Sequence, residues 1–183
     1  MKTCCGVNGF SFSAKTSLIT IIFLLCGLTA TASYAATTTK GDYHLILNGR
    51  SIHLSAPAKG ESFNENNFGT GFQYEFKRPL GSKWVNYVTG SAFNDSYNNL
   101  SYYVGGGQTR RYQLHQGMHL DVGYVAFMMA RKDFDNYQPF LGVLPVASFG
   151  TRKVALNMTY IPAINQKIDE LIFFQLKIAT KGW

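Results

Sequence analysis

Apolar and polar residues alternate with a period of two over much of the chain after residue 60. In the clearest segment Phe68, Phe72 and Phe76 share one face, whereas Gly69 and Glu75 share the other. The same alternation recurs at 155–160 and 172–178. Successive side chains of a strand point to opposite faces, so the pattern predicts strands with one apolar face. Turn-forming clusters separate these segments at 78–82, 94–99, 132–136 and 162–166.

The first 35 residues have the pattern of a secretory signal peptide. Lys2 and Lys15 precede the apolar run 17–28, and the segment contains no acidic residue. The run is too short for a membrane-spanning helix. The small-residue triplets ending at Ala32 and Ala35 fit signal peptidase, and we expect cleavage after Ala35. An uncleaved anchor is the alternative. All three cysteines lie in this segment, so we expect a mature chain, 36–183, without disulfides.

The predicted strands suit a lipid environment better than water. Charged residues make up 15% of the chain, against roughly 25% in soluble domains, and the outer faces carry Tyr, Phe, Leu, Ile and Met. Backbone groups in lipid must all be paired, so a sheet there closes into a barrel. The 183 − 35 = 148 mature residues provide about 18 per strand and connection for eight strands. We therefore predict an all-β fold, an eight-stranded antiparallel transmembrane β-barrel, acting as a monomer.

The segment 115–131 indicates what the barrel encloses. Its even positions are nearly all apolar and would face lipid, whereas its odd positions run from His119 and Asp121 to Val125, Phe127 and Met129. The lumen would then be polar at one end and apolar at the other. An internal hydrocarbon pocket explains the apolar end, because each buried methylene contributes ~0.8 kcal/mol. A plug of side chains in a narrow barrel explains it equally well.

Three separated residues could form an acyl-transfer site. His53 ends the first strand-like segment, and Asp95 and Ser96 lie in an Asn-rich turn. A His can act as general base beside a Ser nucleophile or hydrogen-bond donor, with an Asp to orient it. The alternative is a polar turn and an unrelated His. Arg131, which precedes a charged loop, is either an anion contact at the rim or a solvated charge.

Other chemistries find less support in the sequence. His115, His119 and Asp121 could ligate a metal, but a polar lumen explains them too, and we expect no metal and no cofactor. The run Gly105–Gly107 is followed by no helix and no Lys-Ser or Lys-Thr pair, so it is not a phosphate loop. The cations are sparse and never run together, which excludes a basic nucleic-acid binder.

Several ordered motifs resemble the PagP family of outer-membrane lipid A palmitoyltransferases. The resemblance extends from about Ser51 to Lys177. Its motifs are Phe63-Asn64-Glu65 with Phe68-Gly69-Thr70-Gly71-Phe72, Ala92-Phe93-Asn94-Asp95-Ser96, Ala130-Arg131, Asn136-Tyr137-Gln138-Pro139, Leu144-Pro145-Val146-Ala147-Ser148-Phe149-Gly150 and Met158-Thr159-Tyr160-Ile161-Pro162.

The resemblance implies an enzyme that moves a palmitoyl chain from the sn-1 position of a membrane phospholipid to lipid A, with its site facing the cell exterior. It implies that His53, Asp95 and Ser96 are catalytic and that Arg131 is the family's rim arginine. It also implies that the acyl chain lies beside Val125, Phe127 and Met129. The remaining implied roles are a pocket floor at Gly107 and lateral lipid entry at Pro145 and Pro162.

Two departures from the family pattern leave alternatives open. Asn48 and Asn67 stand where the family often has a second pair of prolines, and the segment before the first strand is short. These changes are compatible with a non-catalytic outer-membrane barrel that binds or passes apolar molecules. A phospholipase, with water as the acyl acceptor, is a further alternative.

Overall fold

The computed structural model describes residues 41–55, 62–76, 78–134, 136–163 and 169–180. The predicted signal peptide, its cleavage site and the three cysteines lie outside these residues. The described part contains eight strands: β1 (Asp42–His53), β2 (Asn66–Glu75), β3 (Trp84–Asn94), β4 (Leu100–Gln113), β5 (His119–Ala130), β6 (Phe140–Gly150), β7 (Val154–Ile161) and β8 (Leu171–Ala179). Within it, no helix is long and apolar enough to cross a membrane.

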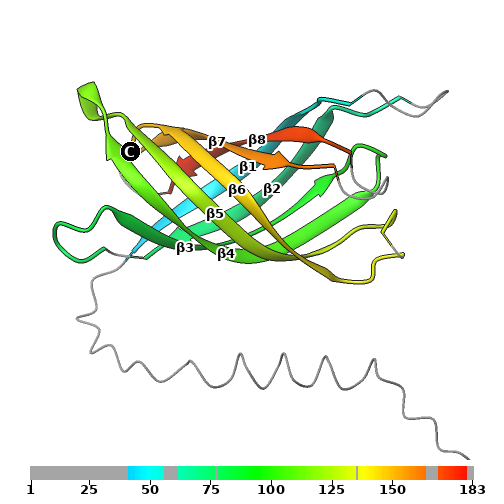
Figure 1. Cartoon of the computed structure of the whole chain (residues 1–183), viewed down its shortest axis with the longest axis horizontal. Helices are drawn as coiled ribbons and strands as arrows, with labels where there is room; N and C mark the ends of the chain where they lie inside the picture. The colour runs from blue at the N-terminus through cyan, green and yellow to red at the C-terminus, as the bar shows by residue number, and fades with distance from the viewer. Residues whose placement is uncertain (1–40, 56–61, 77, 135, 164–168, 181–183) are drawn as a thin grey trace, which may run out of the picture. The chain divides into compact units, whose positions relative to one another are not determined.

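The strands pair in chain order and close into one barrel (Figure 1). Every neighbouring pair is antiparallel, and β1 also pairs with β8. The predicted eight-stranded antiparallel barrel is therefore confirmed. We call the end that carries the β1–β2, β3–β4, β5–β6 and β7–β8 connections the rim, and the opposite end the turn end. The two ends lie right and left in Figure 1.

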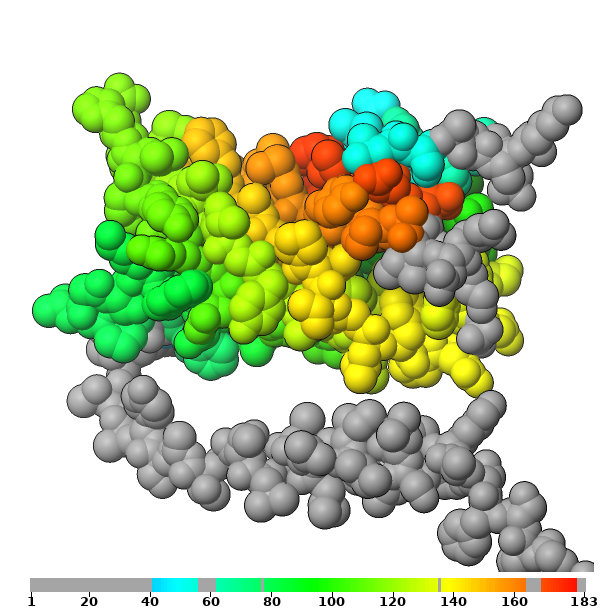
Figure 2. All heavy atoms as spheres, viewed as in Figure 1, coloured from blue at the N-terminus to red at the C-terminus, as the bar shows by residue number. Residues whose placement is uncertain are grey.

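The outer face of the barrel is a belt of exposed apolar side chains. Phe68 and Phe72 on β2 are exposed, as the alternation predicted, and so are Val122, Tyr124 and Met128 on β5. Figure 2 shows side chains of β5, β6 and β7 forming the outer surface on one side of the barrel. The strands pair all the way round, and an apolar outer belt on such a barrel suits a lipid bilayer.

Buried charges lie inside the turn end of the barrel. Glu75 of β2 accepts hydrogen bonds from Lys177 Nζ at 2.6 Å and Arg111 Nη2 at 3.2 Å. Arg111 also makes a two-bond contact with Asp121, at 2.6 and 2.7 Å. Buried ions need such partners, because desolvation is costly. Glu75, Arg111, Asp121 and Lys177 are called the charge cluster below.

One part of the sequence prediction is wrong about strand length. The segment 115–131 is not a single strand, because β5 begins at His119. His115 lies in a short 3-10 turn, where Gln116 and Gly117 have φ values of 60° and 75°. These left-handed backbone conformations end the strand pattern. His115 is exposed at the turn end, whereas Asp121 is buried in the lumen.

The β6–β7 seam is the shortest ladder of the barrel. Its pairs run only from Val146↔Thr159 to Gly150↔Ala155, so the rim half of β6 has no partner on β7. Pro145 is the first residue of β6 beyond the last pair, and Pro162 directly follows β7. Proline lacks the N–H that a ladder requires. The seam is therefore open towards the rim.

The β1–β2 seam, by contrast, is paired up to the rim. Its ladder extends from Asp42↔Glu75 to Arg50↔Asn66, with one irregularity after Asn48, and Ser51 N–H donates to Glu65 O at 2.9 Å. Asn48 and Asn67, which stand where the resemblance implies a second pair of prolines, thus lie in a seam that is paired up to the rim.

Candidate active site

His53 is the last residue of β1 and lies at the rim. Its ring stacks on Phe63, with centroids 3.8 Å apart and an interplanar angle of 12°. Both ring nitrogens are buried, and neither has a hydrogen-bond partner among the described residues. Buried polar atoms are normally paired, so an unpaired imidazole that is held in place by stacking is available to a substrate.

Asp95 organises the tight connection between β3 and β4. Its Oδ1 accepts hydrogen bonds from the backbone N–H groups of Tyr97 and Asn99, both at 2.9 Å. Its Oδ2 accepts one from Ser101 Oγ at 2.8 Å, and Ser101 is fully buried. Residues 94–99 therefore form the polar turn that the sequence analysis considered. The Asp95 carboxylate is held within it by these hydrogen bonds.

The loop residues Phe63 and Asn64 connect His53 to this turn. Phe63 meets Tyr97 edge to face at a centroid distance of 6.2 Å, and Asn64 N–H donates to Ser96 O at 2.9 Å. His53, Asp95 and Ser96 therefore lie on the same rim. The described residues show no hydrogen bond that joins the three directly, so a shared substrate would have to complete the arrangement.

Arg131 lies at the same rim, directly after β5. Its Nε and Nη2 atoms donate to Asp133 at 3.0 and 2.8 Å, and its Nε is 3.9 Å from Asp95 Oδ2. The guanidinium therefore places a positive charge beside the Asp95 turn, which suits an anionic headgroup.

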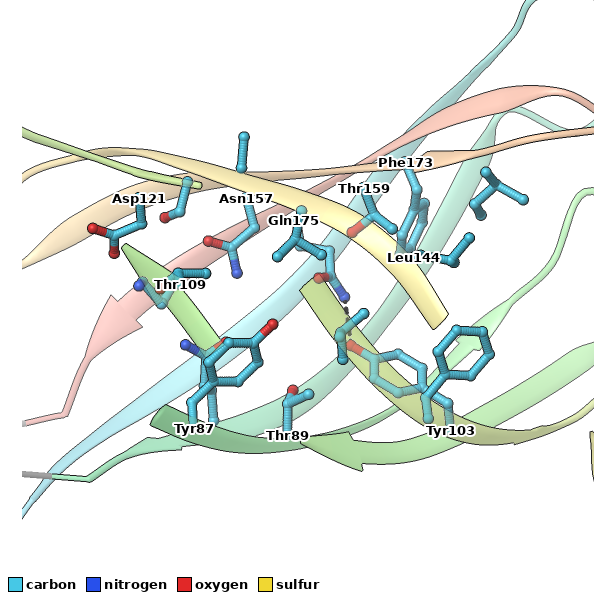
Figure 3. A pocket seen from close by; sticks show the side chains of 18 of the residues that line it. Tyr87, Thr89, Tyr103, Thr109, Asp121, Leu144, Asn157, Thr159, Phe173 and Gln175 are labelled. Atoms are coloured by element: carbon cyan, nitrogen blue, oxygen red, sulfur yellow. Dashed lines mark hydrogen bonds between the residues drawn. The ribbon is translucent and has the colours of Figure 1, made fainter. Parts of the chain in front are cut away.

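A cavity runs down the lumen beneath this rim (Figure 3). Phe93, two residues before Asp95, and Met129, two residues before Arg131, line its rim side together with Val125 and Phe127. Side chains therefore do not plug the lumen completely. The three residues of β5 that the sequence analysis singled out line the remaining cavity. Leu171, the ladder partner of His53, packs with Phe93 at the mouth.

Gly107 lies in β4 beside a tyrosine that lines the cavity. It lies opposite Tyr87 in the β3–β4 ladder, and a Cβ at Gly107 would lie 2.6 Å from the Tyr87 hydroxyl oxygen. That hydroxyl donates to Tyr124 O at 3.2 Å, and Tyr87 lines the cavity. Gly107 therefore makes room for the Tyr87 ring, and a side chain at this position would press on the cavity lining.

Sequence reasoning missed Ser101 as the partner of Asp95 and Phe63 as the support of His53. Their spacing alone carried no signal, because both contacts depend on how the chain closes. Within the described ranges, no three His, Cys, Asp or Glu side chains gather as a metal site.

Fold and site together define a class, a small β-barrel with a polar rim above a lumen cavity that is apolar near the rim. Within that class, the sequence model of the family described as "Antimicrobial peptide resistance and lipid A acylation protein PagP" matches residues 34–177. The chain belongs to this family.

Similar proteins include the lipid A acyltransferase PagP of Methylobacillus flagellatus, 32% identical over 145 residues, covering 78% of this chain and 77% of the relative. The lipid A acyltransferase PagP of Klebsiella pneumoniae is 31% identical over 162 residues, covering 76% and 84%. Among solved structures, the outer-membrane protein Ail of Yersinia pestis has a TM-score of 0.41 at 8% identity, covering 76% of this chain and 99% of Ail.

Proposed function

We propose that the protein is an outer-membrane acyltransferase. It moves a palmitoyl chain from the sn-1 position of a glycerophospholipid to lipid A. Family membership over residues 34–177 supports the reaction class. The observation that carries the site is the unpaired His53 imidazole at the rim above an apolar cavity. A cleaved signal peptide ending at Ala35 and a monomeric barrel complete the proposal.

In this reaction, the acyl tail enters the cavity beside Val125, Phe127 and Met129, which brings the ester carbonyl to the rim. A ring nitrogen of His53 takes the proton from a lipid A hydroxyl, whose oxygen attacks the ester carbon. The bond to the glycerol oxygen breaks, and that oxygen takes the proton to give a lysophospholipid. Ser96 donates a hydrogen bond to the developing oxyanion, and the Asp95 turn holds Ser96 in place.

The test uses the purified barrel, a phospholipid with a labelled sn-1 chain, and lipid A. We expect labelled lipid A and lysophospholipid in equal amounts, with little free fatty acid. Labelled free fatty acid in place of acylated lipid A would assign hydrolysis instead. Binding of phospholipid without any turnover would support the non-catalytic barrel.

Lateral entry through the open β6–β7 seam gives a further prediction. Restoring two backbone donors with Pro145→Ala and Pro162→Ala should stabilise the closed seam by roughly 0.5–1.5 kcal/mol per added hydrogen bond. The donor would then enter on the order of tenfold more slowly. Initial transfer rates from phospholipid vesicles measure this effect, and Pro79→Ala in the β2–β3 turn is the control. An unchanged rate in the double variant would mean that lipid enters elsewhere.

A further inference from the structure

A second cavity lies at the turn end of the barrel, the opposite end from His53. Residues of the β2–β3 and β6–β7 connections line it together with strand residues, and Figure 1 shows both connections at the same end of the barrel. The reaction proposed at the rim uses none of its side chains, so this cavity needs an explanation of its own. Its ionisable side chains are Asp42, His44, Glu75, Arg78, Arg111, His119, Arg152 and Lys177.

Two arginines of this turn-end cavity have no acidic partner. Arg78, in the β2–β3 connection, donates from Nη1 to Ser82 O at 3.4 Å, and Arg152, in the β6–β7 turn, is exposed. Among the described residues, neither guanidinium has a carboxylate within ion-pair distance. Arg111 and Lys177, by contrast, are buried and paired within the charge cluster. The positive charge of Arg78 and Arg152 is therefore available to a ligand.

The two arginines come from opposite sides of the barrel. Four strands separate the β2–β3 connection from the β6–β7 connection in either direction around the closed sheet, yet Arg78 and Arg152 line the same cavity. Asp42 is the one lining carboxylate for which the described residues offer no ion pair, so two unpaired cations face one unpaired anion. An anion is therefore attracted to the space between the arginines. The planar guanidinium fork matches the oxygen atoms of a phosphate group in particular.

Two buried imidazoles give an independent indication of a polar occupant. His44 of β1 is 7% exposed and His119 of β5 is 2% exposed, and both line the cavity. His44 Nδ1 and His119 Nε2 have no hydrogen-bond partner in the part of the chain that the structure describes. Asp121 Oδ2 lies 3.6 Å from His119 Nε2, which is too far for a hydrogen bond. Buried polar atoms normally have partners, so this lining suits water or a polar ligand and not hydrocarbon.

We propose that the turn-end cavity binds a phosphate group between Arg78 and Arg152. The required chemistry is a compact oxyanion whose oxygen atoms accept hydrogen bonds from both guanidinium groups. A phospholipid headgroup supplies it as a phosphate diester, and inorganic phosphate supplies it as the free ion. This binding does not depend on the acyl transfer proposed at the rim.

The experiment titrates the folded barrel, in the phosphate-free detergent dodecyl maltoside, by isothermal titration calorimetry. One probe is inorganic phosphate, and the other is glycerophosphoglycerol, a phospholipid headgroup without acyl chains. Wild type should bind at least one of them saturably, with one molecule per barrel. Arg152→Gln should raise the Kd on the order of tenfold, the value of one hydrogen bond between charged groups. Arg152 is exposed and unpaired in the described structure, so this variant should fold.

Two further variants change the charge of the cavity in opposite directions. Arg78→Gln should weaken binding by a similar factor, because it removes the facing guanidinium. Asp42→Asn should tighten binding, because it removes the unpaired carboxylate from the lining. Unchanged affinity in both arginine variants would overturn the proposal, and so would the absence of saturable binding of either probe to wild type.

Arg110→Gln is the matched control for the loss of a positive charge. Arg110 pairs with Trp84 at the turn-end start of β3, but it is exposed, lies 5.4 Å from the centroid of the Tyr112 ring and does not line the cavity. This variant should bind the probes as wild type does. Equal losses in Arg110→Gln and Arg152→Gln would reduce the binding to general charge attraction and overturn the site.

The two probes also distinguish the sources of the phosphate group. Tighter binding of glycerophosphoglycerol would assign the site to a lipid headgroup, and tighter binding of inorganic phosphate would assign it to the free ion. Neither probe carries an acyl chain, so the result is independent of transfer at the rim. A barrel that binds phosphate without transferring acyl chains would support this site and contradict the proposed function, and the converse result would do the reverse.

Discussion

Replacing His53 with Ala should reduce acyl transfer by on the order of 10²- to 10⁴-fold, because the reaction loses the base that deprotonates the acceptor hydroxyl. The imidazole has no partner to lose within the described residues and stacks only on Phe63, so the barrel should remain folded. Initial rates of labelled-lipid transfer measure the effect. Ser96→Ala should also lower the rate, through loss of the oxyanion donor.

His115→Ala provides the control for the loss of an imidazole, because His115 is exposed at the turn end of the barrel. Its rate should match wild type. If the folded His53 variant kept full activity with the same lipid substrates, the assignment of His53 as the base would be wrong.

Replacing Glu75 with Gln should lower the free energy of unfolding by about 3–5 kcal/mol, the cost of leaving buried charge uncompensated. Glu75 is the shared partner of Lys177 and Arg111, and all three side chains are buried. Arg111 keeps its contact with Asp121, whereas the Lys177 ammonium loses the carboxylate at 2.6 Å. Urea unfolding of the barrel in lipid vesicles, followed by tryptophan fluorescence, measures the change.

Glu65→Gln is the matched control for the charge cluster. Glu65 pairs with Arg50 at 2.8 Å on the exposed part of the rim, where an ion pair contributes roughly 0–1 kcal/mol. Similar losses for the two variants would contradict the cluster's structural role. The double change Glu75→Leu with Lys177→Met should recover much of the stability, because it removes both buried charges together.

The alternation of apolar and polar residues predicted most of the barrel. The segments 155–160 and 172–178 lie within β7 and β8, and the aromatic face of 68–76 points outwards on β2. The period of two locates a strand and its outer face, since both are local properties. The pattern failed at His115, where it did not register the left-handed turn at Gln116 and Gly117.

The candidate site was predictable only in part. His53, Asp95, Ser96 and Arg131 were identified through motifs, and the structure places them on one rim. The hydrogen bonds from Ser101 to Asp95 and from Gln175 to Tyr103 were not foreseen, because barrel closure and register decide which distant strands face each other across the lumen.

The most direct measurement is the mass spectrum of lipid A from outer membranes that contain the protein, its His53→Ala variant, or neither. The proposed function predicts lipid A heavier by one acyl chain only with the unaltered protein. Identical spectra from all three membranes, with the barrel present and folded, would contradict it.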